Sequence, residues 1–205
     1  PMGLAQFEIL HLATGYLTYY AGLEAVPELI VEDDTRRVEL HRKALGVVGA
    51  IVPWNAPVFI ASNKIAPALA AGNTIVVKTA PTTPLTTLRL GELWADVVPA
   101  GVVNILSGGN EAGALLVAHE DVAKITFTGS TETGRKIMAA AAPTLKRVTL
   151  ELGGNDAAIV LRDADVAAIA PAIFAFAFFN SGQVCAVIKR LYVHDSIYED
   201  VCAAL

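Results

Sequence analysis

Several side chains able to do chemistry stand at the ends of short apolar segments in this 205-residue chain. Cys185 follows the glycine of Ser181-Gly182, and a thiolate there could act as a nucleophile if a helix N-terminus stabilised it. Glu151 closes a strongly apolar segment just before two glycines, so we expect its carboxylate to be buried or to face a cleft, where it could serve as a general base. The alternatives are an inert buried cysteine and a solvated acid at the end of a strand.

Three further groups could bind a ligand. Lys78 ends a run of β-branched residues, and a lysine buried there needs an anionic or hydroxyl partner. Asn55 offers an amide donor at the end of another segment. The turn Gly129–Gly134 follows an apolar segment and opens a helical one, so its backbone N–H groups could bind a phosphate, although the residues after it do not match a P-loop. The alternative is an ordinary glycine-rich turn in which Ser130 or Thr131 caps the helix.

The segments that would position these groups alternate in composition along the chain. Short runs rich in Val and Ile are typical of strands, and the longer Ala- and Leu-rich stretches between them are typical of helices. This alternation predicts repeated βαβ units and an open parallel sheet with helices on both faces, which binds ligands beyond the carboxyl ends of its strands. The expected strands are Gly46–Trp54, Asn73–Thr79, Val102–Ser107, Lys124–Gly129, Arg147–Gly153 and Ala157–Leu161. The expected helices are Pro57–Ala71, Pro84–Val98, Glu111–His119 and Ser130–Ala142.

Four segments outside this alternation predict further elements. The pattern of Leu4–Leu23 predicts an amphipathic helix, and the alternation in Arg36–Leu45 predicts an exposed strand. The apolar stretch Val166–Phe179 is too short for a membrane span of about 20 residues, so we expect a helix buried on all sides. Ser196–Leu205 is expected to be helical.

Composition excludes several classes of protein. With 54% hydrophobic and 17% charged residues the chain is expected to fold, and a net charge of −5 without a basic patch argues against a nucleic-acid partner. The two cysteines form no CxxC and the four histidines are scattered, so no metal site is expected. We expect no signal peptide, no membrane insertion and a reducing, cytoplasmic location. Because the chain opens with Pro1 and stops at Leu205 inside an expected helix, we also expect a fragment.

Taken together, five segments resemble motifs of the aldehyde dehydrogenase superfamily, in that family's order and at about its spacing. These segments are Pro53–Pro57, Gly72–Lys78, Phe127–Gly134, Leu150–Gly154 and Gly182–Cys185. The resemblance implies a Rossmann-like, doubly wound cofactor domain over residues 1–154, with part of an oligomerisation arm near residues 36–45. It also implies that residues 155–205 are the truncated start of a second α/β catalytic domain, and that the full-length protein is a homo-oligomer.

The resemblance further implies the oxidation of a small-molecule aldehyde to a carboxylic acid with NAD or NADP. Cys185 would attack the aldehyde to give a thiohemiacetal and then a thioester. Asn55 and the Cys185 backbone N–H would stabilise the oxyanion, and Glu151 would activate the hydrolytic water. The residues implied in cofactor binding are Trp54, Lys78, Thr128, Gly129, Ser130, Thr131, Glu132, Thr133 and Gly134.

Two departures from the family pattern leave alternatives open. Family members that prefer NAD often carry Glu three residues after the lysine, whereas this chain has Pro81, which leaves NADP open. The family's later Glu-x-Phe-Gly-Pro segment is absent, so a cofactor-binding fragment without turnover is a second hypothesis. A cysteine-dependent acyl hydrolase that needs no cofactor is a third.

Overall fold

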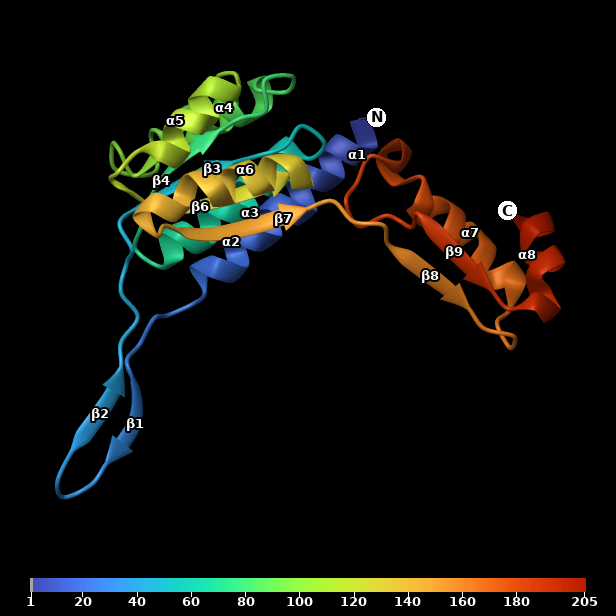
Figure 1. The fold of residues 1–205 in the computed structure, drawn as a ribbon, viewed down its shortest axis with the longest axis horizontal. Coiled ribbons are helices and arrows are strands. Elements are labelled where there is room, and N and C mark those ends of the chain that lie inside the picture. The colour runs from blue at the N-terminus through green and yellow to red at the C-terminus, as the bar shows by residue number, and fades with distance from the viewer. Residues whose placement is uncertain (1) are drawn as a thin grey trace. The chain divides into compact units, whose positions relative to one another are not determined.

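The larger part of the computed structural model, which describes residues 2–205, is built on a five-stranded sheet (Figure 1). The strands follow the order β5 (Val103–Leu106), β4 (Thr74–Lys78), β3 (Val47–Ile51), β6 (Val122–Gly129) and β7 (Arg147–Leu152). β4 and β6 both pair with β3 in parallel, and β5 pairs with β4 in parallel. This is the order of a doubly wound sheet, whose direction of winding reverses between β3 and β6. The predicted α/β fold with a parallel sheet is confirmed.

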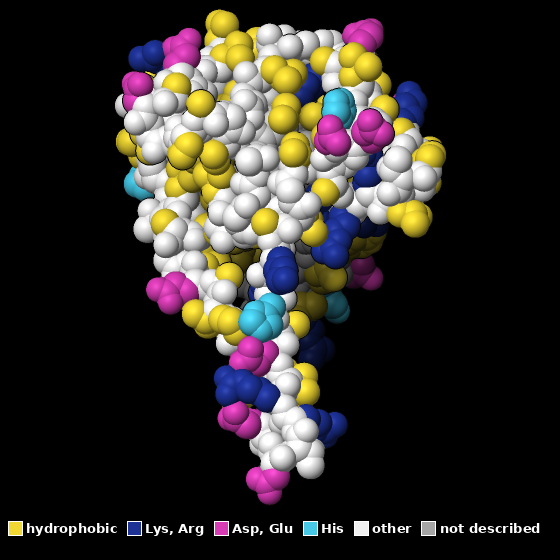
Figure 2. Space-filling view, turned by 90° about the vertical axis from the view of Figure 1, so that its left-hand side faces the viewer, with side chains coloured by type: hydrophobic (Ala, Val, Ile, Leu, Met, Phe, Trp, Pro, Cys, Tyr) yellow, Lys and Arg dark blue, Asp and Glu magenta, His cyan; other side chains and the backbone are white. Residues whose placement is uncertain are grey.

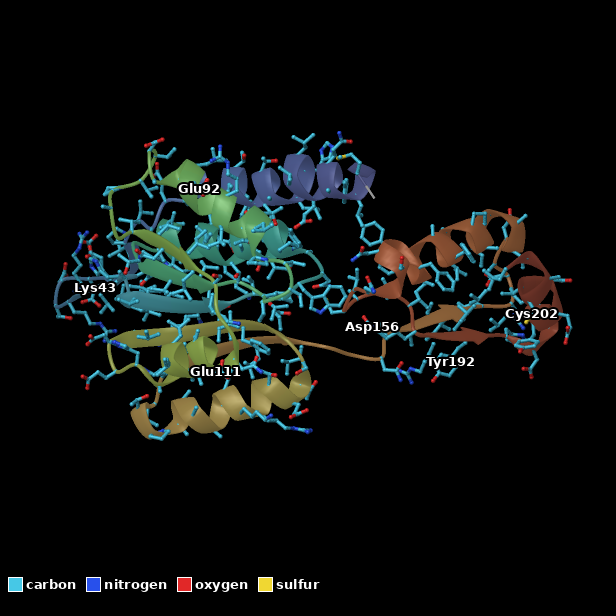
Figure 3. All side chains as sticks on the ribbon, turned by 90° about the horizontal axis from the view of Figure 1, so that it is seen from above. Lys43, Glu92, Glu111, Asp156, Tyr192 and Cys202 are labelled. Atoms are coloured by element: carbon cyan, nitrogen blue, oxygen red, sulfur yellow. The ribbon has the colours of Figure 1, made fainter. Side chains whose placement is uncertain are left out.

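Helices cover both faces of this sheet. They are α3 (Pro57–Ala70), α4 (Leu85–Trp94), α5 (Asn110–Ala118) and α6 (Thr131–Ala141), followed by a short 3-10 turn at Ala142–Thr144. Because side chains alternate along a strand, Val48 and Ala50 of β3 pack in the core with α3, whereas a side chain at Gly49 would meet Leu116 of α5. Figure 3 shows α6 and the N-terminal helices on opposite sides of the sheet.

The N-terminal segment confirms the helix expected over residues 4–23. It runs through α1 (Met2–Phe7), one π-helical stretch (Glu8–Ala13) and α2 (Thr14–Ala21), and packs against α3. The Glu8 carboxylate accepts hydrogen bonds from the backbone N–H groups of Val58 and Phe59, at 2.8 and 2.9 Å. The residue at the N-cap of α3, Ala56, makes no side-chain bond there, so Glu8 supplies the cap from about 50 residues away.

The exposed strand expected near residues 36–45 is present as β2 (Arg37–Leu40), but it has a partner that the sequence analysis missed. β1 (Glu28–Glu32) pairs with it in antiparallel fashion to form a hairpin. Nearly all residues of both strands are exposed. Charged side chains of both signs gather on the hairpin (Figure 2), among them the ion pair of Arg37 and Glu32 at 2.6 Å.

A second compact unit begins at Leu152. It contains two parallel strands, β8 (Ala157–Val160) and β9 (Arg190–Val193), and the helices α7 (Val166–Ala177) and α8 (Tyr198–Ala204), with short 3-10 turns at Phe179–Gly182 and Asp195–Ile197. The unit starts three residues before the expected domain of residues 155–205. The assignment of the two parts to cofactor binding and catalysis stays a prediction.

The prediction that Val166–Phe179 forms a helix buried on all sides is wrong. α7 forms, with the Asp165 carboxylate accepting the N–H of Ala168 at its start, but Ala170 is its only buried residue. Phe174 and Phe176 are each 51% exposed. The apolar composition of α7 favours burial against other elements. The second unit offers only two strands and one short helix, which are too few to surround α7. None of the helices in residues 2–205 has the length and apolar character needed to cross a membrane.

Candidate functional site

A cavity of about 340 Å³, which we name the α5–α6 cavity, lies at the carboxyl ends of β3 and β4. Its apolar wall consists of Ile51, Gly113, Ala114, Val117, Ile137 and Ala140, and its polar groups are Lys78, Asn110, Thr133 and Lys136. Open α/β sheets bind ligands at this edge, close to the point where the winding reverses. An apolar wall with a few polar groups is typical of a small-molecule site.

Lys78 ends β4 and is buried, with 4% of its surface exposed. Burial lowers the pKa of its ammonium, and the attraction of Glu111 acts in the opposite direction. The expectation that Lys78 is buried at a strand end is met. A buried cation beside a cavity favours an anionic or hydroxyl-rich ligand in that cavity.

The turn from β6 into α6 has the geometry of an anion site. Gly129 ends β6, and a side chain there would lie 2.4 Å from the ring of Phe127. Ser130 caps the eleven-residue helix α6, because its Oγ accepts the N–H of Thr133 at 3.2 Å. The remaining N–H groups of the first turn, at the positive end of the helix dipole, suit a phosphate. The cap expected at Ser130 and the phosphate site are therefore compatible with each other.

The other predicted cofactor residues lie on or near this turn and the end of β3. Thr128 and Gly134 are buried, while Thr131 and Glu132 are exposed. Trp54 is 48% exposed, and its carbonyl accepts a hydrogen bond from the Thr83 hydroxyl at 3.3 Å. Asn55 is half-buried beside it, just before α3.

Glu151 lies at the end of β7 and lines a different, larger cavity of about 830 Å³, which we name the Glu151 cavity. Its side chain is exposed, as in the alternative of a solvated acid at the end of a strand, so its role as a general base stays a prediction. Lys64 and Thr126 line the same cavity, and the buried Lys64 ammonium donates to the Thr126 hydroxyl at 3.1 Å. Desolvation lowers the pKa of Lys64 to about 8, while Glu151 raises it and Lys124 lowers it further. A carboxylate and a lysine that can release its proton near neutral pH thus share one cavity.

The sequence analysis missed Lys64, although the signal was present. In α3 the buried residues Ala61, Ile65 and Ala68 repeat at helical spacing, and position 64 lies three after the first and four before the last. Lys64 therefore belongs to the buried face of α3. A lysine on a buried helix face needs a polar partner, here Thr126.

Cys185 belongs to the second unit and lies on a turn between the 3-10 turn Phe179–Gly182 and β9. Its side chain is exposed and free, and no helix begins at this position. The chain reverses just before it through left-handed backbone conformations at Asn180, Ser181 and Gly182. The Lys189 ammonium donates to the Cys185 carbonyl at 2.7 Å, which holds a cation close to this turn.

Within the described residues the predicted site residues belong to two cavities and to two compact units. Lys78 and Thr133 line the α5–α6 cavity, and Glu151 lines the Glu151 cavity. Cys185 lies in the other unit. No cluster of His, Cys, Asp and Glu in residues 2–205 is arranged to hold a metal ion.

The strand order, the capped glycine turn and the adjoining cavity define a doubly wound α/β protein of the kind that binds nucleotides. A comparison with family models is more specific, since residues 2–205 match the aldehyde dehydrogenase family. The chain therefore belongs to the aldehyde dehydrogenase family.

Individual relatives agree with this assignment. The chain is 49% identical to a phenylacetaldehyde dehydrogenase from Pseudomonas fluorescens, over 98% of the chain and 41% of that protein. It is 45% identical to the putative aldehyde dehydrogenase FUS7 of Gibberella moniliformis, over 99% of the chain and 44% of that protein. Among solved structures, the NAD+ complex of a Bacillus cereus aldehyde dehydrogenase matches with a TM-score of 0.96 and 39% identity, over 100% of the chain and 43% of that structure. The chain thus spans less than half the length of these relatives.

Proposed function

We propose that the protein to which this chain belongs oxidises an aldehyde to a carboxylic acid with NAD or NADP, and that Cys185 is the nucleophile. The observation that carries the proposal is the match of residues 2–205 to the aldehyde dehydrogenase family. The exposure of the Cys185 thiol supports it, because a nucleophile must be accessible to its substrate.

The residues around the α5–α6 cavity fit a dinucleotide cofactor. Ile51, Val117 and Ile137 offer an apolar wall to an adenine ring, and the buried Lys78 offers a cation to its ribose. The first turn of α6 offers its N–H groups to a pyrophosphate. When bound, the nicotinamide of such a cofactor accepts a hydride from the substrate.

The chain's own residues account for the remaining steps. The Cys185 thiol gives up its proton to solvent, and its sulfur forms a bond to the aldehyde carbon as the carbonyl π bond breaks. The Asn55 amide and the Cys185 N–H stabilise the resulting oxyanion. Loss of hydride turns this thiohemiacetal into a thioester. Glu151 then takes a proton from water, the hydroxide adds to the thioester carbon, and the carbon–sulfur bond breaks to release the acid and restore the thiol.

The test follows the absorbance of reduced nicotinamide with a panel of aldehydes. Cys185→Ser should abolish the signal, while the matched variant Cys202→Ser, which changes the other exposed cysteine, should keep it. Equal rates for Cys185→Ser and the unchanged chain would refute the proposal. Ester cleavage that needs Cys185 but no nucleotide would favour an acyl hydrolase instead.

A second function, nucleotide binding without turnover, is favoured by one observation. The α5–α6 cavity is lined entirely by residues before Glu151, whereas the chain covers only 41–44% of the relatives quoted above. Calorimetric titration with NAD+ and an activity assay on the same sample separate the two functions. Binding without any turnover would assign the 205-residue chain to the second.

We further propose that the protein forms a homo-oligomer through the β1–β2 hairpin. The exposed apolar side chains of Leu29, Ile30 and Val38 support this, since they project from a hairpin whose strands pair only with each other. Light scattering should give a mass above that of one chain, and Ile30→Lys should lower it. A single-chain mass for the unchanged protein would refute this assignment. A cytoplasmic location stays a prediction.

A further inference from the structure

We propose that the α5–α6 cavity prefers an adenosine whose ribose carries a 2′-phosphate, and that Lys136 determines this preference. The inference rests on the proposed function, because it assumes that the cavity holds the adenosine half of the cofactor. It narrows the choice between NAD and NADP to NADP.

The charges around the cavity carry the argument. Two lysines, Lys78 and Lys136, line it, and no Asp or Glu does among the described residues. In dinucleotide-binding folds a carboxylate binds the free ribose hydroxyls, while a nearby cation accommodates a 2′-phosphate. The segment that follows Lys78 reads Thr-Ala-Pro-Thr-Thr-Pro over residues 79–84, so it supplies no carboxylate either. The cavity therefore has the charge of a 2′-phosphate site.

The two acids nearest these lysines are directed elsewhere. Glu111 attracts Lys78, but its carboxylate folds back over Gly109, where an added Cβ would lie 2.5 Å from it. Glu132 pairs with Lys136 at 2.6 Å, one helical turn apart on the outer surface of α6. Both side chains of this pair are more than 70% exposed, and such surface pairs contribute little. Lys136 can leave Glu132 for a phosphate at small cost.

Lys78 and Lys136 would contribute in different ways. Lys78 is fixed and buried at the end of β4, so it contributes to any ribose bound there and is a poor discriminator. Lys136 is exposed, and it lies one turn after Thr133 on the same face of α6, where Thr133 also lines the cavity. A charge-assisted hydrogen bond to a phosphate dianion is expected to tighten binding about tenfold or more.

The test is calorimetric titration of the 205-residue chain with adenosine 2′,5′-bisphosphate and with adenosine 5′-monophosphate. The two ligands differ only in the 2′-phosphate, so the comparison isolates the 2′ position. The unchanged chain should bind the 2′,5′-bisphosphate about tenfold more tightly. Lys136→Gln should remove most of this preference and leave the affinity for the 5′-monophosphate within about twofold. Arg135→Gln, which removes the adjacent exposed cation that does not line the cavity, should leave the preference unchanged.

Each contrary result has a separate meaning. Equal or tighter binding of the 5′-monophosphate would overturn the inference and leave the proposed function standing. Equal weakening of both ligands by Lys136→Gln would overturn the assignment of Lys136 to the 2′ position. Binding of neither ligand by a chain with a native circular dichroism spectrum would overturn the inference together with the cofactor site of the proposed function.

Discussion

Lys64→Met replaces the buried ammonium beside the Glu151 cavity with an apolar side chain of similar length. In the unchanged chain Lys64 is 4% exposed and bonded to the Thr126 hydroxyl at 3.1 Å. Its pKa falls from the ordinary value of 10.5 to about 8, chiefly through desolvation. Since one pKa unit corresponds to about 1.4 kcal/mol, protonated Lys64 costs the folded chain about 3 kcal/mol at neutral pH.

The sign of the pH dependence follows from proton counts. The folded-state pKa lies below the unfolded one, so between about pH 8 and pH 10.5 the unfolded chain binds more protons than the folded chain. The free energy of unfolding of the unchanged chain therefore receives a contribution that rises with pH in this window, by about 2 kcal/mol from pH 7 to pH 10. Lys64→Met lacks this contribution.

Urea titrations at pH 7, 8, 9 and 10 test whether the lowered pKa of Lys64 makes the free energy of unfolding rise with pH. Both tryptophans, Trp54 and Trp94, lie before Glu151, so their fluorescence reports the unfolding of the first unit. The stability of Lys64→Met relative to the unchanged chain should fall by about 2 kcal/mol between pH 7 and pH 10. Loss of the hydrogen bond to Thr126 changes the free energy of unfolding by about 1 kcal/mol at every pH. It does not change how that free energy depends on pH.

The control is Lys43→Met, at an exposed lysine, which should parallel the unchanged chain at every pH. Parallel curves for Lys64→Met and the unchanged chain would refute the claim that burial lowers the pKa of Lys64. A steeper rise with pH in the variant would contradict the sign itself.

Three other substitutions test local contacts by the shift of the urea midpoint. Glu8→Gln should lower the free energy of unfolding by about 1 kcal/mol, because a neutral amide is a weaker acceptor than a carboxylate for the two N–H groups of α3. An unchanged urea midpoint would contradict this cap. Gly129→Ala should lower the free energy of unfolding by about 1–3 kcal/mol, because the added methyl group would overlap the buried Phe127 ring. An unchanged midpoint would show that the ring can move away freely. Asp165→Ala should lower the free energy of unfolding by about 1 kcal/mol, because α7 loses its N-terminal cap. Circular dichroism measures this change, since the second unit has no tryptophan. An equal loss in Asp163→Ala would contradict the capping role of Asp165.

The elements of the sheet could be predicted because their signal is local. Each strand of the five-stranded sheet overlaps a short segment that was expected to be a strand, and Pro57 marks the start of α3 as expected. The cap at Ser130 also follows from local sequence. These features depend on residues within a few positions of one another.

Contacts between distant segments could not be predicted in this way. Nothing in the sequence near Glu8 shows that its carboxylate caps a helix that begins almost fifty residues later. The hairpin partner β1 was missed because Glu28–Glu32 has acids at both ends and a bulge that interrupts its register. The exposure of α7 depends on how many other elements are present to cover it, which its own composition does not reveal.

The proposed role of Cys185 is tested most directly by trapping the acylated chain. The chain is incubated with an aldehyde and NAD+ or NADP+, quenched in acid, digested and mapped by mass spectrometry. We expect one acyl group on the peptide that contains Cys185. This acyl group should depend on the oxidised nucleotide and should accumulate further in Glu151→Gln. An acyl group on Cys202 instead, or none on Cys185 in a chain that produces reduced nicotinamide, would contradict it.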